Sequence, residues 1–79
     1  MKTRIITLTG VLYDGDADAV HARTKSGDIT ILDHHQPLLS ILARESVIRV
    51  ESQSGLQSIE APSGFLHLDG NNELTVLVD

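Results

Sequence analysis

The sequence feature that most constrains the fold is a succession of short strand-like runs, each ended by a turn signal, with no helical periodicity between them. The clearest runs alternate apolar and polar residues with the period of two that a half-buried strand requires. In residues 46–51, Ile48 and Val50 share one face and charged residues share the other. Turn signals recur about every eight to twelve residues, as is typical of all-β domains. We therefore predict a small antiparallel β-sandwich or flattened barrel of about eight to ten short strands.

Gly, Pro, Asn, Asp and Ser clusters separate the expected strands. We expect strands in residues 3–9, 19–24, 29–32, 46–51, 56–61, 65–69 and 73–78, and turns in residues 14–16, 25–28, 54–55 and 70–72. Two stretches leave alternatives open. Residues 11–13 fit a second strand, or a continuation of the first strand past a bulge at Gly10. Residues 37–42 fit a buried strand or one helical turn opened by Pro37, and their short length favours the strand.

The core must come almost wholly from aliphatic side chains. Leu, Ile and Val number 11, 7 and 6, whereas the chain holds one Phe, one Tyr, no Trp and no Cys. Residues 1–79 are too few for more than one domain, and a chain this short buries only about 60–65% of the surface that its unfolded form exposes. The absence of Cys excludes a disulfide framework, a thiolate zinc site and a Cys nucleophile. Good packing or a partner must therefore supply the stability that disulfides give other small domains.

The charge balance argues against a nucleic-acid ligand. Six Lys and Arg residues stand against eleven Asp and Glu residues, for a net charge of −5, and the basic residues are scattered. A nucleic-acid site needs a basic stripe, and a single-strand site also needs stacking aromatic residues. No run approaches the roughly 18 apolar residues of a membrane span, and no secretory cleavage pattern follows the first residues. We expect a soluble intracellular protein.

Histidines and carboxylates form the densest polar group in the sequence. Asp33, His34 and His35, with His21, His67 and Asp69 elsewhere, are residue types that can bind zinc or non-haem iron. Adjacent residues on a strand point to opposite faces, so His34 and His35 could share one ion only within an irregular loop. Structural or interface histidines are the favoured interpretation. A free-standing module that binds a metal or small polar ligand through Asp33, His34, His35 and His67 remains the alternative function.

Other local motifs give catalysis no support. Asp14, Asp16 and Asp18 resemble a calcium loop, but the closing Glu is absent and a solvated turn is favoured. Ser63 lacks the G-x-S-x-G frame of a nucleophile. The sequence also lacks the H-x-H pair that a cupin-type hydrolase would need. Gly64 is expected to supply a backbone conformation closed to other residues, or a close approach of two chains. We predict no catalytic residue, no cofactor site and no metal site.

Residues 27–42, GDITILDHHQPLLSIL, resemble the N-terminal β-sandwich domain of the epsilon subunit of F-type ATP synthases, whose pattern is close to G-E-x-G-I-L-P-G-H-A-P-L-L-T-x-L. Four further segments resemble the family in the same order along the whole chain. They are the Tyr13-Asp14-Gly15 turn followed by Val20, the strand Val47-Ile48-Arg49-Val50, the segment Ser63-Gly64-Phe65-Leu66, and the ending Leu74-Thr75-Val76-Leu77-Val78-Asp79.

The chain departs from the family pattern at several loop positions. Asp33 and His34 stand where the family has Pro-Gly, Gln36 replaces Ala, Thr30 replaces Gly, and Pro62-Ser63 replaces Ser-Gly. Most family members continue from the last strand into a two-helix domain. The resemblance of this chain is to the short form of the epsilon subunit, which does not have that C-terminal helical hairpin.

The resemblance implies a non-catalytic central-stalk subunit that links the gamma subunit to the c-ring during proton-driven ATP synthesis. Such a subunit is peripheral, has no cofactor and lies on the cytoplasmic face of the energy-transducing membrane. Carried over by position, the residues expected to contact gamma are Thr7, His35, Leu38, Leu39 and Ser40, and those expected to contact the c-ring are Lys25, Ser26, Gly27 and Asp28. Because consecutive strand residues face opposite ways, at least one of Leu38 and Leu39 is expected in the core.

Overall fold

The computed structural model describes residues 1–79 and contains nine strands and no helix. The strands are β1 (Lys2–Thr7), β2 (Gly10–Asp16), β3 (Ala19–Thr24), β4 (Gly27–Leu32), β5 (Leu38–Ile41), β6 (Ser46–Ser52), β7 (Gly55–Ala61), β8 (Gly64–Leu68) and β9 (Glu73–Val78). The prediction of an all-β fold with about eight to ten strands is confirmed. None of these strands is long, because the turn residues between them interrupt each run.

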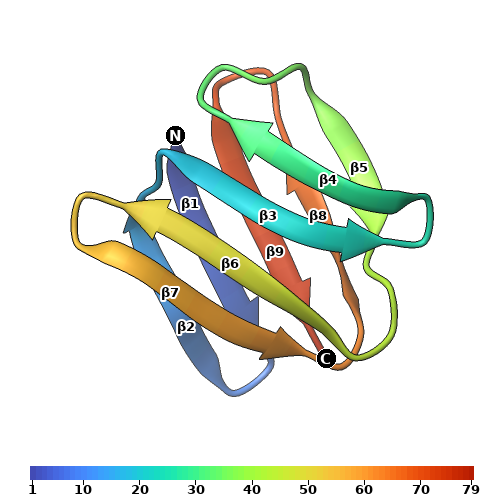
Figure 1. Ribbon diagram of the computed structural model, residues 1–79. Helices are drawn as coiled ribbons and strands as arrows, with labels where there is room; N and C mark the ends of the chain where they lie inside the picture. Colours follow the sequence, from blue (N-terminus) through green and yellow to red (C-terminus); the bar gives the residue numbers. More distant parts are fainter.

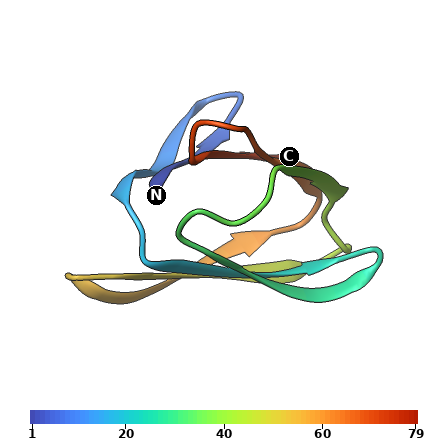
Figure 2. The same cartoon turned by 90° about the horizontal axis from the view of Figure 1, so that it is seen from above.

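Two separate sheets face each other, which makes the domain a sandwich (Figures 1 and 2). One sheet has five strands in the order β2-β1-β9-β8-β5, and the other has four in the order β4-β3-β6-β7. The four-stranded sheet lies in front in Figure 1, and Figure 2 shows the two layers edge-on. All strand pairs are antiparallel except β1 and β9, which run parallel with Ile5 beside Val76. The antiparallel prediction is therefore wrong for this one pair.

The aliphatic core lies between the two sheets. Leu66 and Leu68 of β8 are fully buried, and Leu74, Val76 and Val78 of β9 are at most 3% exposed, so the inward faces predicted for these runs are confirmed. The other fully buried large apolar side chains are Ile5, Ile31, Leu42, Ile48, Val20 and Val50. Thr3 is buried with its hydroxyl donating to the Met1 carbonyl at 3.2 Å. No buried side-chain polar atom lacks a hydrogen-bond partner.

The structure shows the secondary structure of both stretches for which the sequence allowed two alternatives. Residues 11–13 belong to a separate strand, β2, which forms a hairpin with β1 and has an irregularity opposite Ile5 and Ile6. Residues 38–41 form strand β5 rather than a helical turn. The turn expected at residues 14–16 is wrong, because β2 continues to Asp16. Pairing of Asp14 with Arg4 and of Asp16 with Lys2 across the strands overrides the local turn preference.

Strand β8 approaches β9 unusually closely at Gly64. Its φ of 143° lies in the region that favours glycine, and an added Cβ would lie 1.9 Å from the carbonyl oxygen of Leu77. The Gly64 carbonyl also accepts a hydrogen bond from the Leu42 amide at 2.9 Å. Leu42 in turn pairs with Thr24 of the other sheet, so this point joins the two layers. Both roles expected of Gly64 from the sequence are confirmed.

Candidate functional site

An apolar row crosses the outer face of the five-stranded sheet. Strand pairing sets Ile6 beside Val11 and Leu77, Leu77 beside Phe65, and Phe65 beside Ile41. Val11, Phe65 and Ile41 are 56%, 41% and 55% exposed, while Ile6 and Leu77 are half-buried. We call these five residues, Val11, Ile6, Leu77, Phe65 and Ile41, the apolar row. It contains one residue from every strand of the sheet.

Leu39 extends this surface along β5. It is 70% exposed and lies two residues before Ile41, on the same face of the strand. Its lateral neighbour is His67, which is followed across the sheet by Thr75. Isolated exposed apolar side chains are common on protein surfaces, but contiguous ones mark interaction sites. The apolar row is therefore the candidate interaction surface of this domain.

The sequence contains a signal for the apolar row that pattern analysis missed. Each of its members on β1, β5, β8 and β9 stands next to a buried apolar residue, as in Ile5-Ile6 and Phe65-Leu66. Such pairs break the apolar-polar alternation, so one member must face outward. The pairs alone do not show that the outward members form one row, because that depends on strand register.

The five residues expected to contact gamma do not form one surface. Leu39 lies beside the apolar row, whereas Leu38 is half-buried against the core and Ser40 is half-buried on the same inward side. At least one of Leu38 and Leu39 was expected in the core, and the structure has Leu38 partly buried and packed against the core. His35 is exposed in the loop between β4 and β5. Thr7 ends β1, with β9 and β8 separating that strand from β5.

The four residues expected to contact the c-ring lie together at the hairpin between β3 and β4. Lys25, Ser26, Gly27 and Asp28 are all exposed. The hydroxyl of Thr24 donates to the Gly27 carbonyl at 2.9 Å and accepts a hydrogen bond from the Ser26 amide at 3.1 Å, which holds the turn. The Lys25 amide donates to the Ile41 carbonyl at 3.0 Å, so the hairpin adjoins the β5 end of the apolar row.

Three of the residues considered for a metal or ligand site, Asp33, His34 and His35, have other polar contacts. The Asp33 carboxylate lies 2.8 Å from the buried N-terminal ammonium of Met1 and accepts a hydrogen bond from the Asn72 side chain at 2.7 Å. The His35 ring nitrogen Nδ1 lies 2.7 Å from the Gln36 carbonyl. No three His, Asp or Glu residues of the chain are placed to hold a metal ion. The acidic residues Asp14, Asp16 and Asp18 likewise form no such cluster.

The Asp33 contacts lower the pKa of its carboxyl from the usual 3.8 to about 2. The hydrogen bond from Asn72 is the largest cause, and the hydrogen bond from the N-terminal ammonium is the next. Both favour the ionised form. Asp33 therefore joins the N-terminus to the β4–β5 loop and to the turn before β9 by contacts that its negative charge strengthens.

We expect Asp33→Asn to lower the melting temperature at neutral pH. Because the folded-state pKa is depressed, the carboxylate stabilises the domain above the usual value of 3.8, and this stabilisation is lost as the pH falls toward about 2. The variant should therefore show a shallower decline of melting temperature across this pH window than the original chain. Thermal unfolding followed by circular dichroism at several pH values between 3.8 and about 2 measures the melting temperature of each variant. Asp18→Asn is the matched control because Asp18 is exposed and takes part in no ion pair, and equal pH profiles for the two variants would contradict the assignment.

Comparison with protein-family models shows the family of this chain. The model for the ATP synthase Delta/Epsilon chain β-sandwich domain matches residues 1–79. The chain belongs to this family. The structure contains no helix of the length and apolarity that a membrane span requires.

Curated proteins of this family have clearly similar sequences. The ATP synthase epsilon chain of Frankia casuarinae is 35% identical over 66 residues, covering 84% of this chain and 78% of the relative. The chloroplastic epsilon chain of Cyanidioschyzon merolae is 34% identical over 79 residues, covering 100% of this chain and 59% of the relative. The chain thus spans about three-fifths to three-quarters of the length of these relatives.

Solved structures share the fold at low sequence identity. A chain of the Euglena gracilis mitochondrial ATP synthase, in a structure of OSCP, F1 and c-ring, matches with a TM-score of 0.89 at 18% identity. A chain of the Tetrahymena thermophila mitochondrial ATP synthase, in a structure of central stalk and c-ring, matches with a TM-score of 0.80 at 15% identity. Each match covers 99% of this chain, and 49% and 62% of the respective solved chains.

Proposed function

We propose that this domain is a non-catalytic part of the central stalk of an F-type ATP synthase and links the gamma subunit to the c-ring during proton-driven ATP synthesis. The observation that carries the proposal is the family match over the whole chain, residues 1–79. In this role the domain is peripheral and lies on the cytoplasmic face of the energy-transducing membrane. It transmits rotation through its contacts and performs no chemistry of its own.

The apolar row is the surface proposed to contact gamma. Apolar area removed from water stabilises a complex by about 25 cal/mol per Å² before the cost of association, and the most exposed members of the row supply such area. Phe65 lies on the second strand from one edge, with Leu77 and Ile41 on either side, so a partner can enclose it. Leu39, which lies beside the apolar row on β5, contributes further exposed apolar area. Of the residues first expected at gamma, Leu39 therefore has the strongest geometric support.

The hairpin of Lys25, Ser26, Gly27 and Asp28 is the surface proposed to contact the c-ring. Its side chains are exposed and include both signs of charge, which suits a polar contact with loops of another subunit. The hydrogen bond from Lys25 to Ile41 places this hairpin next to the apolar row. One end of the sandwich can thus engage gamma and the c-ring at adjoining surfaces.

Co-expression with a gamma subunit tests the proposal. We expect the two chains to elute together in gel filtration at micromolar concentration, and we expect the isolated domain to hydrolyse no ATP. A matched run with the domain alone fixes its own elution position. Separate elution of the two folded chains at that concentration would overturn the proposed partnership.

A further inference from the structure

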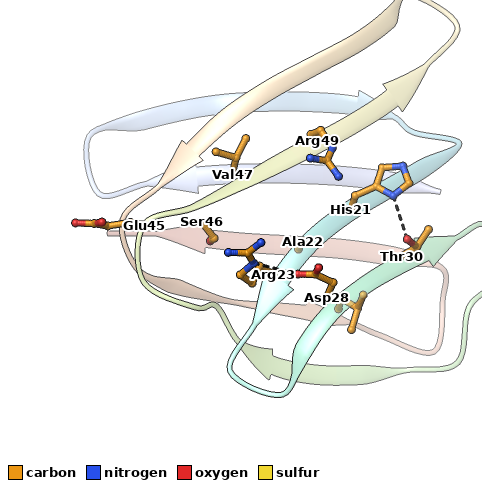
Figure 3. Close-up of a pocket in the computed structure, with 10 residues that line it drawn as sticks. His21, Ala22, Arg23, Asp28, Thr30, Glu45, Ser46, Val47 and Arg49 are labelled. Carbon is orange, nitrogen blue, oxygen red and sulfur yellow. Dashed lines mark hydrogen bonds and ion pairs between the residues drawn. The ribbon is translucent and has the colours of Figure 1, made fainter.

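The outer face of the four-stranded sheet contains a polar hollow of about 290 Å³ (Figure 3). It lies over β3, β4 and the first half of β6, on the layer opposite the apolar row. Its apolar lining is limited to Ala22, Ile29 and Val47, and the rest is polar or charged. Sites for drug-sized molecules are larger and mostly apolar, so this hollow suits a small, strongly polar ligand.

Two arginines, Arg23 and Arg49, are among the residues that line the polar hollow. Strand pairing sets His21 beside Arg49, and Arg23 lies two residues farther along β3, on the same face of that strand as His21. Arg23 donates from Nε to the Asp28 carboxylate at 3.1 Å, which leaves its terminal nitrogens outside that bond. Arg49 takes part in none of the structure's ion pairs. Two guanidinium groups in one hollow repel each other, and an anion bound between them would reduce that repulsion.

The nearby acidic groups determine which anion fits. Asp28 and Glu45 also line the hollow and offset the two arginines in formal charge, so an anion must gain its affinity from direct hydrogen bonds to the guanidinium groups. Glu51 is held by the His21 ring through Nε2, while Nδ1 of that ring lies 3.0 Å from the Thr30 hydroxyl. A guanidinium fork binds two oxygens of one ligand, so a carboxylate is satisfied by one arginine alone. A tetrahedral dianion has enough oxygens and charge to engage both.

We propose that the polar hollow binds a small dianionic tetrahedral oxyanion, represented by orthophosphate, between the guanidinium groups of Arg23 and Arg49. The site is separate from the proposed gamma contact, because the apolar row lies on the other sheet, but it shares Asp28 with the hairpin proposed for the c-ring. A gamma subunit on the apolar row would leave the hollow open. Phosphate binding by the isolated domain and co-elution with gamma can therefore succeed or fail separately.

Titration of the isotope-labelled domain with sodium phosphate, followed by amide chemical shifts at constant ionic strength, tests the proposal. We expect saturable shifts confined to β3, β4 and β6, with a dissociation constant of about 1–10 mM. Sulfate should bind comparably, and acetate should bind about ten-fold more weakly or worse. Shifts that rise linearly without saturation, or equal binding of acetate, would overturn the proposal.

Three variants are expected to change the affinity for phosphate in different ways. Arg49→Gln should weaken phosphate binding about ten-fold, because one guanidinium is lost. Asp28→Asn should tighten binding several-fold, because it removes the competing carboxylate that holds Arg23. Arg4→Gln removes the same charge from the outer face of the other sheet and should leave binding unchanged. Equal affinities for Arg49→Gln and Arg4→Gln would overturn the proposed site.

Discussion

Replacing Gly64 with alanine should unfold most of the isolated domain at room temperature. The added Cβ would lie 1.9 Å from the Leu77 carbonyl oxygen, and the obstacle is backbone, which cannot rotate away as a side chain can. The φ of 143° adds conformational strain. We expect a loss of about 4 kcal/mol or more, which is exceptional for one substitution and comparable with the whole stability of a domain of this size. Far-UV circular dichroism during urea titration measures it.

Two other glycines separate the steric cause from the conformational one. Gly55 has a φ of 114° but open space where a methyl group would lie, so Gly55→Ala should cost only the strain, about 1 kcal/mol. Gly10 has open space and no positive φ, and Gly10→Ala should change stability by less than about 1 kcal/mol. A Gly64→Ala variant no less stable than Gly55→Ala would show that β8 can move away from β9.

Strand positions and inward faces follow from the sequence because burial imposes strict alternation. Ile48 and Val50 are fully buried in β6, with exposed Arg49 between them, as the pattern predicts. A slip of one residue would place these side chains in water, so the pattern determines the face of the strand strongly. The same reasoning holds for Leu66 and Leu68 in β8.

Strand direction and partner choice do not follow from alternation. The parallel pairing of β1 with β9 joins opposite ends of the chain, and either direction would bury the same faces. The expected turn at residues 14–16 failed for a related reason, since a local preference for turns yielded to pairing with β1. Both departures arise from long-range pairing, which a single sequence read locally does not contain.

The candidate site could be predicted only in part from the sequence, because it too depends on long-range strand pairing. The hairpin of Lys25 to Asp28 is local, and its residues remain together in the structure. The apolar row draws one residue from each of five strands, so it exists only once register is known. Resemblance by position indicated Leu39, which lies beside the apolar row, but also indicated Leu38, which packs against the core.

Placing a carboxylate in the apolar row should strongly weaken the proposed complex with gamma. Phe65 is 41% exposed and has Leu77 and Ile41 beside it, so a partner that covers the row would enclose Glu at this position without a counter-charge. Burial of an unpaired charge and loss of an aromatic contact together should weaken association by about 100-fold or more. Gel filtration and calorimetric titration of Phe65→Glu with gamma measure the change.

A matched substitution on the other sheet tests whether this loss belongs to the row. Leu56 is 63% exposed on β7 and faces outward from the four-stranded sheet, so Leu56→Glu makes a similar change of charge and apolarity on the opposite layer. We expect it to bind gamma as the original chain does, while both variants retain the β-sheet circular dichroism spectrum. If Leu56→Glu lost binding and Phe65→Glu kept it, gamma would have to contact the four-stranded sheet, and the polar hollow would then be covered in the assembled stalk.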